Sequence, residues 1–545
     1  MNKSSTTTRV EMLANARNRQ EPFDVLVIGG GATGAGLALD AASRGFSVLL
    51  VEQSDFGKGT SSRSTKLVHG GVRYLEQGNI PLVMEALHER ELLRLNAPHL
   101  VHDLPFIVPT YAFWEAPFYG IGLKVYDLLA GKAGFGKSKV LPAQQVVSAI
   151  PTIKQDGLKH GVLYHDGQFD DTRLLLSLIL TAVQKGAVIL NYASAVGLTR
   201  STTGRIDGAE IQDGESGEKF TVKARVVINA TGAFTDEIRR LSRPDAERLI
   251  SPSQGIHLVF DRSFLPGDTA IMVPHTSDGR VMFVIPWHDH ALVGTTDTPI
   301  EKASLEPKPL AQEIDFVLST ASLYLAKPPR REDILSVFVG IRPLVKGGTS
   351  STKALSRDHT IEIDDGGLLT ICGGKWTTYR RMAKDGIDKA IESGGLAQVP
   401  CNTKELRLHG YQPLSSQTEL PLPYGHLKVY GSEAATVLAI AGERAGWEKR
   451  LHPSLPYIAA EVIHAARHEM CRTVEDFLAR RVRALFLNAR AAQEMSLAVA
   501  ELLAGELGLS RSWQEEQVRL FQELSRQYCV EPTKATFAGS GKPAC

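Results

Sequence analysis

Residues 24–34 read Asp-Val-Leu-Val-Ile-Gly-Gly-Gly-Ala-Thr-Gly, and this stretch decides the fold. Its first five residues have the composition of a buried strand, and the rest fits the pattern G-x-G-x-x-G. In that pattern Gly29 allows a tight turn, Gly31 lets the backbone approach a pyrophosphate, and Gly34 lets helix and strand pack closely. The stretch therefore predicts a strand, a phosphate-binding turn and the start of a helix.

The residues that follow complete a nucleotide-binding unit. A helical stretch runs to Arg44, and residues 47–51 form a second predicted strand that leads into Glu52. The helix N-terminus presents N–H groups and a partial positive charge to phosphates. Glu52 can accept hydrogen bonds from a ribose 2′-hydroxyl. Strand, turn, helix, strand and acid occur in the order of a dinucleotide site, but this unit alone does not distinguish FAD from NAD.

Two regions of different character divide the chain. Up to about residue 400, short β-branched runs alternate with helical stretches, which predicts an α/β domain with added antiparallel strands. Further on, apolar residues recur with the helical period, which predicts a helical domain over residues 405–530. We expect residues 1–21 to be a disordered leader and residues 531–545 a flexible tail. We expect residues 22–400 to form the domain that binds the nucleotide and the substrate.

The bulk composition excludes several classes of protein. Sixty-one basic and sixty acidic residues leave a formal charge of +1, which gives no global field for binding nucleic acid. The five cysteines lie far apart without a Cys-x-x-Cys pair, which argues against a disulfide framework, a zinc site and a redox dithiol. No window reaches the ~18 apolar residues that span a bilayer. We expect a cytoplasmic protein with no metal and no nucleic-acid partner.

Three later segments favour FAD over NAD. Residues 60–75 place hydroxyls, cations and a glycine pair in one short stretch. Residues 226–232 read as a strand that ends in Ala-Thr-Gly, as expected where a strand returns beneath a bound dinucleotide. Residues 368–379 read as a strand, a glycine pair and a helix. The N-terminus of that helix would suit the anionic reduced ring of a flavin.

Together these segments resemble the FAD-dependent glycerol-3-phosphate dehydrogenases, a branch of the D-amino-acid-oxidase-like flavoproteins. The most specific strings are His-Gly-Gly-Val-Arg-Tyr-Leu at 69–75, Gly-Ile-Arg-Pro-Leu at 340–344 and Gly-Gly-Lys-Trp-Thr-Thr-Tyr-Arg at 373–380. The resemblance runs from about residue 20 to 530. It implies an α/β fold with α+β elements: a Rossmann-like FAD-binding domain with an inserted antiparallel-sheet substrate domain, plus an α-helical C-terminal domain.

The resemblance also implies which residues form the site. The expected FAD-binding residues are Gly29, Gly31, Gly34, Glu52, Ser61, Ser62, Lys66, His69, Thr231, Gly232, Gly373, Gly374 and Thr377. The dianionic phosphate of glycerol 3-phosphate calls for arginine, whose fork suits bidentate contact. The expected substrate-binding residues are Arg73, Tyr74, Arg342, Arg357 and Lys375.

The chemistry requires hydride transfer from substrate C2 to flavin N5 and a base for the hydroxyl proton. Histidine has a suitable pKa. His69 and His257 both lie in segments that match the active-site region of the family, and we prefer His257. Lys375 would polarise the forming ketone or lower the pKa of the substrate hydroxyl, and Arg342 would stabilise charge at C2 or bind the phosphate. The identity of the base stays open.

The electron acceptor follows partly by elimination. The chain has no second G-x-G-x-x-G unit and no cysteine pair, which leaves a quinone or dioxygen. The resemblance implies a quinone and peripheral attachment at the inner face of the cytoplasmic membrane. Residues 117–137 combine aromatic and leucine side chains with lysines, which predicts either a membrane-interface segment or an ordinary core helix. Three alternative functions stay open: a glycerol-3-phosphate oxidase, an amine or amino-acid oxidase, and a non-catalytic FAD-fold binding protein. Assembly as a homodimer also stays open.

Overall fold

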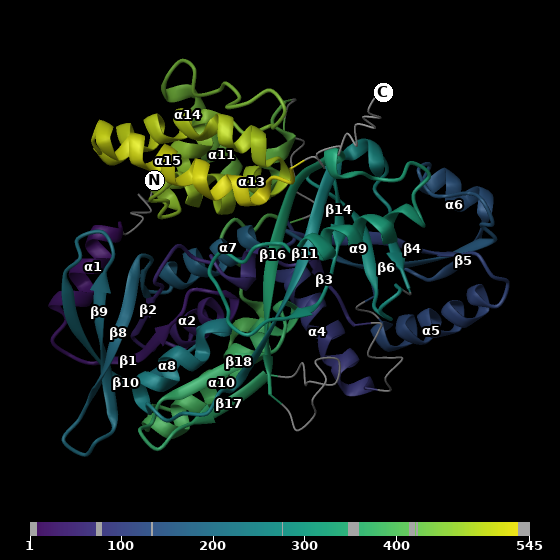
Figure 1. Cartoon of the computed structure of the whole chain (residues 1–545). Helices are drawn as coiled ribbons and strands as arrows, with labels where there is room; N and C mark the ends of the chain where they lie inside the picture. Colours follow the sequence, from purple (N-terminus) through teal and green to yellow (C-terminus); the bar gives the residue numbers. More distant parts are fainter. Residues whose placement is uncertain are drawn as a thin grey trace, which may run out of the picture.

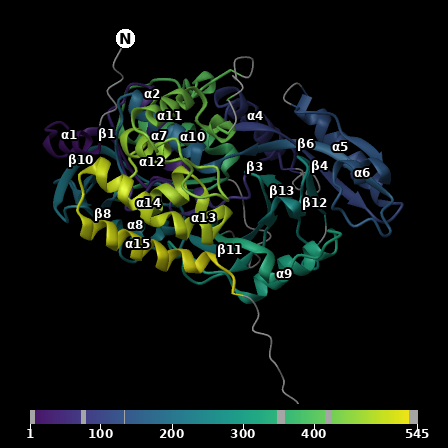
Figure 2. The same ribbon diagram turned by 90° about the horizontal axis from the view of Figure 1, so that it is seen from above.

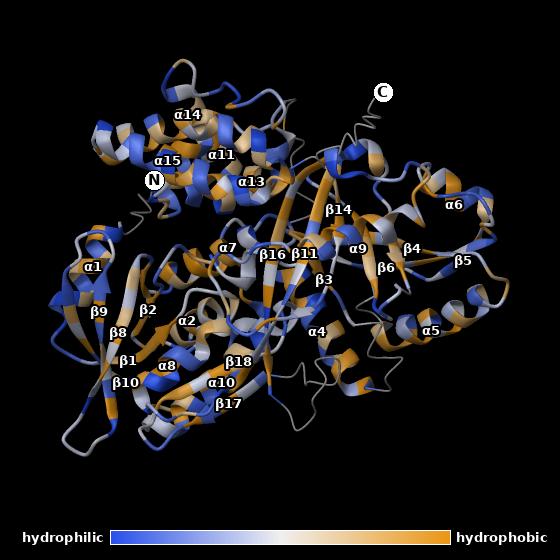
Figure 3. Cartoon of the chain, in the orientation of Figure 1, coloured by the Kyte–Doolittle hydropathy of each residue, from blue (hydrophilic) through white to orange (hydrophobic). Residues whose placement is uncertain are grey.

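Two sheets and a group of C-terminal helices build the protein (Figure 1). The computed structural model describes residues 8–71, 79–131, 134–274, 276–346, 359–413, 420 and 423–531. Many strands of both sheets are rich in hydrophobic residues (Figure 3). The expected fold class, a Rossmann-like α/β fold with an added antiparallel sheet and a helical C-terminal region, is confirmed.

The first sheet carries the glycine-rich turn. Its strand order in the described chain is β17-β18-β10-β1-β2-β7, with β8 and β9 attached through β10, and β18, β10, β1, β2 and β7 run parallel. The strands are β1 (Phe23–Ile28), β2 (Val48–Val51), β7 (Val188–Leu190), β8 (Ala193–Arg200), β9 (Ile206–Asp213), β10 (Lys219–Asn229), β17 (His359–Ile363) and β18 (Leu369–Gly373). Val25, Leu26 and Val27 are fully buried, as expected for a parallel sheet covered on both faces.

Helices cover this first sheet. The helix that follows the glycine turn, α2, packs against both α7 and α10. The covering helices are α2 (Ala32–Ser43), α7 (Asp171–Gln184), α8 (Thr235–Ser242) and α10 (Tyr379–Gly394). Gly36 and Gly386 lie where α2 and α10 meet, since a Cβ at Gly36 would lie 2.8 Å from Tyr379 and one at Gly386 would lie 2.7 Å from Leu37.

The second sheet lies beside the first and is largely antiparallel. Its order is β15-β11-β14-β13-β12-β4-β6-β3, with β16 paired to β11 and β5 to β6. Its strands are β3 (Leu67–Val68), β4 (Val101–Thr110), β5 (Lys139–Pro142), β6 (His160–Phe169), β11 (Ile250–Asp261), β12 (Ala270–Val273), β13 (Met282–Trp287), β14 (His290–Gly294), β15 (Thr298–Pro299) and β16 (Ile334–Val345). The long pair β11 and β16 sets Ser253 opposite Arg342 and His257 opposite Phe338.

The remaining helices flank the second sheet or form the C-terminal region. Beside the sheet lie α4 (Ile80–Asn96), α5 (Glu115–Ala130), α6 (Ala143–Ala149) and α9 (Ala311–Ser322). The C-terminal region contains α11 (Ala434–Glu443), α12 (Ala459–His468), the π-helical turn η10 (Asp476–Arg481), α13 (Ala484–Leu487), α14 (Ala489–Leu507) and α15 (Arg511–Ser525). Viewed from above, α5 and α6 lie at the opposite end of the molecule from helix α1 (Arg9–Asn18) (Figure 2).

Short helical turns connect these elements. They are η1 (Thr60–Ser62), η3 (Gly232–Phe234), η4 (Arg262–Phe264), η5 (Arg331–Asp333), η6 (Trp376–Thr378), η7 (Thr403–Glu405), η9 (Gly425–Glu433) and η11 (Arg526–Tyr528). Within the described ranges, no helix is both long enough and apolar enough to cross a membrane.

The N-terminal segment differs from the expected disordered leader. Residues 9–18 form helix α1 (Arg9–Asn18), which begins at a capping box made by Thr8 and Glu11. The buried Arg9 guanidinium forms an ion pair of 2.6 Å with Asp213 and donates to the carbonyl of Asn191. The prediction is therefore wrong for these residues, because a distant ion pair orders a polar segment. Residues 532–545 of the expected tail lie outside the described residues, and the domain limits at 400 and 405 stay predictions.

Candidate active site

A cavity of about 460 Å³ lies beyond the carboxyl ends of β1, β2, β10 and β18. In open parallel sheets this is where ligands bind. Many of the residues expected to bind FAD line it: Gly29, Gly31, Glu52, Ser61, Thr231, Gly232, Gly373 and Gly374. Lys375 lines it too. The structure thus brings together segments that lie more than three hundred residues apart in the sequence.

The glycine turn leaves no room for side chains. Gly29 has a φ of +114°, which favours glycine. A Cβ at Gly34 would lie 1.8 Å from the carbonyl oxygen of Gly29. A Cβ at Gly31 would lie 3.1 Å from Ser61 Oγ, and this hydroxyl accepts the N–H of Ala32 at 2.9 Å. The N-terminus of α2 and Ser61 therefore form a close wall suited to a pyrophosphate.

Glu52 is held rigidly at the end of β2. Its Oε2 accepts the N–H of Gly30 at 2.6 Å, and its Oε1 accepts the N–H of Ser54 at 2.9 Å. Burial raises the pKa of this carboxyl, although both backbone N–H groups favour its charged form. A fixed acid beside a glycine turn and a helix N-terminus fits the ribose and pyrophosphate of a dinucleotide. These residues fit FAD.

Five residues expected to bind FAD do not line the cavity: Gly34, Ser62, Lys66, His69 and Thr377. The fully buried Lys66 ammonium donates to the carbonyl of Ser62 at 2.8 Å and to Asp171 at 2.6 Å. Burial lowers the pKa of Lys66 to about 7, against the opposing effect of Asp171. In the structure Lys66 supports the loop that carries Ser61.

A polar cluster surrounds Arg342, one of the residues expected to bind substrate. On β16, Arg342 Nη1 lies 3.2 Å from Asp297 Oδ1, and its Nη2 donates to Thr295 Oγ1 at 3.4 Å. The other oxygen of Asp297 lies 3.9 Å from Arg280 Nη1. Gly255 leaves room for this guanidinium, because a Cβ there would lie 2.7 Å from Arg342 Nη1. Asp297 and Arg280 are not among the site residues predicted from the sequence, since only the strand pairing brings them to Arg342.

His257 lies deep in the second sheet. Its ring stacks on Phe338 at 4.9 Å between centroids, and its Nε2 lies 3.0 Å from Thr65 Oγ1. Burial, and then the charges of Lys66 and Arg342, lower the pKa of His257 well below its ordinary value. The imidazole is therefore neutral at neutral pH, which leaves it able to accept a proton but weakly basic.

The other expected residues divide into two groups. His69 follows β3 and is half-buried, and Lys375 precedes η6, whose Trp376 donates its indole N–H to the carbonyl of Ser61 at 2.9 Å. Arg73, Tyr74 and Arg357 lie outside the described residues. Sequence reasoning also missed Lys58, which lines the cavity. Its position in the polar loop after Glu52 is the sequence feature from which Lys58 could have been predicted.

Comparison with known proteins agrees with this geometry. Residues 24–380 match the family of FAD dependent oxidoreductases, and residues 401–517 match the C-terminal domain of alpha-glycerophosphate oxidase. The chain is 43% identical to the mitochondrial glycerol-3-phosphate dehydrogenase of Arabidopsis thaliana, over 93% of this chain and 87% of that protein. It is 41% identical to the mitochondrial glycerol-3-phosphate dehydrogenase of Homo sapiens, over 94% of this chain and 74% of that protein.

A solved structure extends the similarity to three dimensions. The X-ray structure of the glycerol-3-phosphate dehydrogenase from Bacillus halodurans complexed with FAD has a TM-score of 0.79 and 29% identity, and covers 97% of this chain and 99% of that one. Fold and cavity define an FAD-dependent oxidoreductase. Within that class, the chain belongs to the FAD-dependent glycerol-3-phosphate dehydrogenases.

Proposed function

We propose that the chain oxidises sn-glycerol 3-phosphate to dihydroxyacetone phosphate and passes the electrons to a quinone. Bound FAD supplies the hydride acceptor, its N5. The proposal is carried by the dinucleotide cavity. Lys375 and Pro343 both line it, and Pro343 follows Arg342 in the sequence. In this proposal the permanently charged Arg342 meets the phosphate of the alcohol.

The proposal assigns a role to each expected substrate-binding or catalytic residue. Arg342 orients the substrate through its phosphate or stabilises charge at its C2 oxygen, and Asp297 keeps the guanidinium in place. Lys375 polarises the C2 oxygen from the cavity wall. In this proposal Arg73, Tyr74 and Arg357 complete the phosphate site. His257 and His69 stay the candidates for accepting the hydroxyl proton.

Anaerobic titration of the purified protein with glycerol 3-phosphate tests this function. We expect the flavin absorbance to bleach fully at about one equivalent, and a soluble quinone analogue to restore it much faster than dioxygen. NAD(P) should not be reduced. Peroxide formed at the rate seen with quinone would favour the oxidase. Bleaching by amino acids with no competition from phosphate would favour an amino-acid oxidase, and no bleaching would favour a non-catalytic FAD protein.

Helix α5 offers a surface for reaching a membrane quinone. Five apolar side chains spaced three or four residues apart form its outer stripe: Trp114, Phe118, Ile121, Val125 and Leu128. Their exposed fractions range from 40% to 81%. Tyr119, Leu123 and Tyr126 pack inward, so the helix is apolar on both sides, and Figure 3 shows it at the edge of the molecule. Soluble proteins rarely expose such a stripe without a partner.

We therefore propose peripheral attachment through the outer stripe of α5, at the inner face of the cytoplasmic membrane. Lys124 on the helix and Lys137 and Lys139 after it would meet anionic headgroups. The two sequence interpretations of this segment are thus compatible, because its inner face packs on the protein and its outer face is exposed. Assembly as a homodimer stays a prediction.

Charges placed in the outer stripe should release the protein from membranes. We expect Ile121→Glu combined with Leu128→Glu to lower binding to anionic phospholipid vesicles at least tenfold, since two exposed apolar side chains are lost at roughly 1.5–3 kcal/mol each. Oxidation of glycerol 3-phosphate with a soluble quinone analogue should not change. The control is Leu497→Glu on α14, which is 56% exposed and lies outside the stripe. Equal vesicle sedimentation of both variants would refute the attachment.

A further inference from the structure

The loop of residues 53–63, between β2 and β3, forms one wall of the FAD cavity. Its lining residues are Gln53, Gly57, Lys58, Gly59, Thr60 and Ser61. Apart from the single turn η1, it contains no helix or strand. Gly57 donates its N–H to the carbonyl of Gly30 at 3.1 Å, so the loop touches the glycine turn directly. Any movement of the loop therefore changes the shape of the cofactor site.

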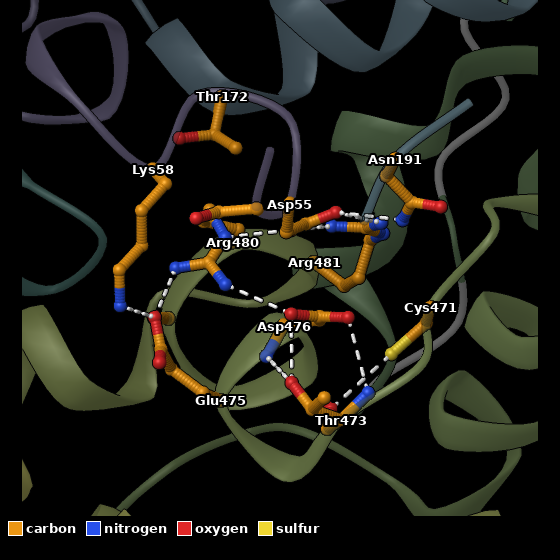
Figure 4. A network of polar contacts seen from close by, with 12 residues as sticks. Asp55, Lys58, Thr172, Asn191, Cys471, Thr473, Glu475, Asp476, Arg480 and Arg481 are labelled. Atoms are coloured by element: carbon orange, nitrogen blue, oxygen red, sulfur yellow. Dashed lines mark hydrogen bonds and ion pairs between the residues drawn. The ribbon is translucent and has the colours of Figure 1, made fainter. Parts of the chain in front are cut away.

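Asp55 ties this loop to the C-terminal region. Its carboxylate is fully buried and receives Arg481 Nη1 at 2.7 Å, Arg481 Nη2 at 2.9 Å and Arg480 Nε at 2.6 Å (Figure 4). Burial alone would raise the pKa of Asp55, yet the two arginines lower it below its ordinary range. Arg481 is itself fixed by donating to the carbonyl of Glu469 at 2.8 Å. The loop is thus anchored on η10 and the turn before it.

Lys58 makes a second link at the cavity itself. It lines the cavity, and its ammonium lies 2.5 Å from Glu475 Oε1 and 2.7 Å from Glu306 Oε1. The same Glu475 oxygen accepts Arg480 Nη1 at 2.6 Å. Burial would raise the pKa of Glu475, but Arg480 and Lys58 lower it to about 2. Glu475 is therefore charged at neutral pH. It contacts both Lys58 of the loop and Arg480, which binds Asp55 of the loop.

We propose that the C-terminal helical region contributes to FAD binding. Glu475 is a positioning residue that sets FAD affinity through Lys58 and the loop of residues 53–63. A loop already fixed in its bound shape binds a ligand without the cost of becoming ordered. The network holds the loop in that shape from outside the FAD-binding sheet. The proposal concerns flavin retention and does not depend on which substrate is oxidised.

Release of FAD from the holoenzyme tests the proposal. In Glu475→Gln the side chain, which is 25% exposed, keeps its size but loses its charge. We expect FAD to leave at least fivefold faster, followed as rising flavin fluorescence after dilution, with little change in the unfolding midpoint. Lys58→Met should also speed release. The two effects should be less than additive in the double variant, because the two side chains share the contact between Lys58 and Glu475.

A second ion pair of the C-terminal region supplies the matched control. Arg472 binds Glu215 at 2.7 and 2.9 Å, joining the C-terminal region to the turn between β9 and β10. Its exposure of 22% is similar to that of Glu475, and it lies apart from the loop. We expect Arg472→Gln to leave FAD release unchanged. Equal acceleration in this control, or unchanged release in both Glu475→Gln and Lys58→Met, would overturn the proposal.

Discussion

Replacing Arg342 by alanine is expected to lower kcat/KM for glycerol 3-phosphate by at least ~2 kcal/mol, roughly thirtyfold. The variant loses a charge-assisted contact from a guanidinium that Asp297 and Thr295 hold on β16. FAD content should stay normal, because Arg342 does not line the dinucleotide cavity. Steady-state kinetics with a soluble quinone analogue, together with flavin content, measure the effect.

The two roles of Arg342 give different kinetics. A guanidinium that binds only the phosphate acts equally in the ground and transition states, so its loss raises KM. One that stabilises charge at C2 instead lowers the rate of flavin bleaching at saturating substrate. Arg342→Lys should rescue only part of the activity, since an ammonium cannot reproduce the fork.

A control tests whether the effect belongs to the site. Arg331→Ala, just before the same strand, removes an arginine whose ion pair with Asp315 lies near the surface, and it should keep full activity. Wild-type kcat/KM in Arg342→Ala would place Arg342 among the structural residues.

Replacing Gly34 by alanine is expected to abolish flavin retention. The new Cβ would lie 1.8 Å from the carbonyl oxygen of Gly29, and no rotamer change relieves a clash with backbone. Separating helix and turn should cost about 3 kcal/mol, roughly a hundredfold or more in FAD affinity. The purified variant should be colourless, with FAD measured after denaturation.

Gly505 provides the matched glycine. It lies inside α14, and a Cβ there meets nothing within 4 Å. Gly505→Ala should retain its flavin and gain about 0.5–1 kcal/mol of stability, because alanine is the better helix former. A yellow Gly34→Ala protein with normal FAD content would show that α2 can move away from the turn without harm to the site.

The parts of the site that are local in sequence could be predicted. The glycine turn and Glu52 lie within thirty residues, and each demands a particular residue type at a particular spacing. Lys66 shows the limit: a lysine in a polar loop suggested a cofactor contact, but its partner Asp171 lies 105 residues away. Arg9 is similar, because Asp213, which orders α1, lies 204 residues away.

For helix α5, the sequence could not distinguish a membrane-interface segment from a core helix, and the reason is different. Its inner and outer faces are both apolar, so hydrophobic periodicity gives no signal that distinguishes a core face from an exposed one. The cluster of Asp297 and Arg280 around Arg342 depends on strand pairing. Such pairing between distant strands leaves no mark in the local sequence.

The contact between Asp55 and Arg480 also bears on how the protein is made. The two residues are 425 positions apart. At a synthesis rate of about 5–20 residues per second, Asp55 waits roughly 20–85 s after leaving the ribosome for its partners. The strand β18 likewise joins the parallel sheet only after residue 373 is made. The nucleotide pocket can therefore be completed only late in translation, after most of the chain has been made.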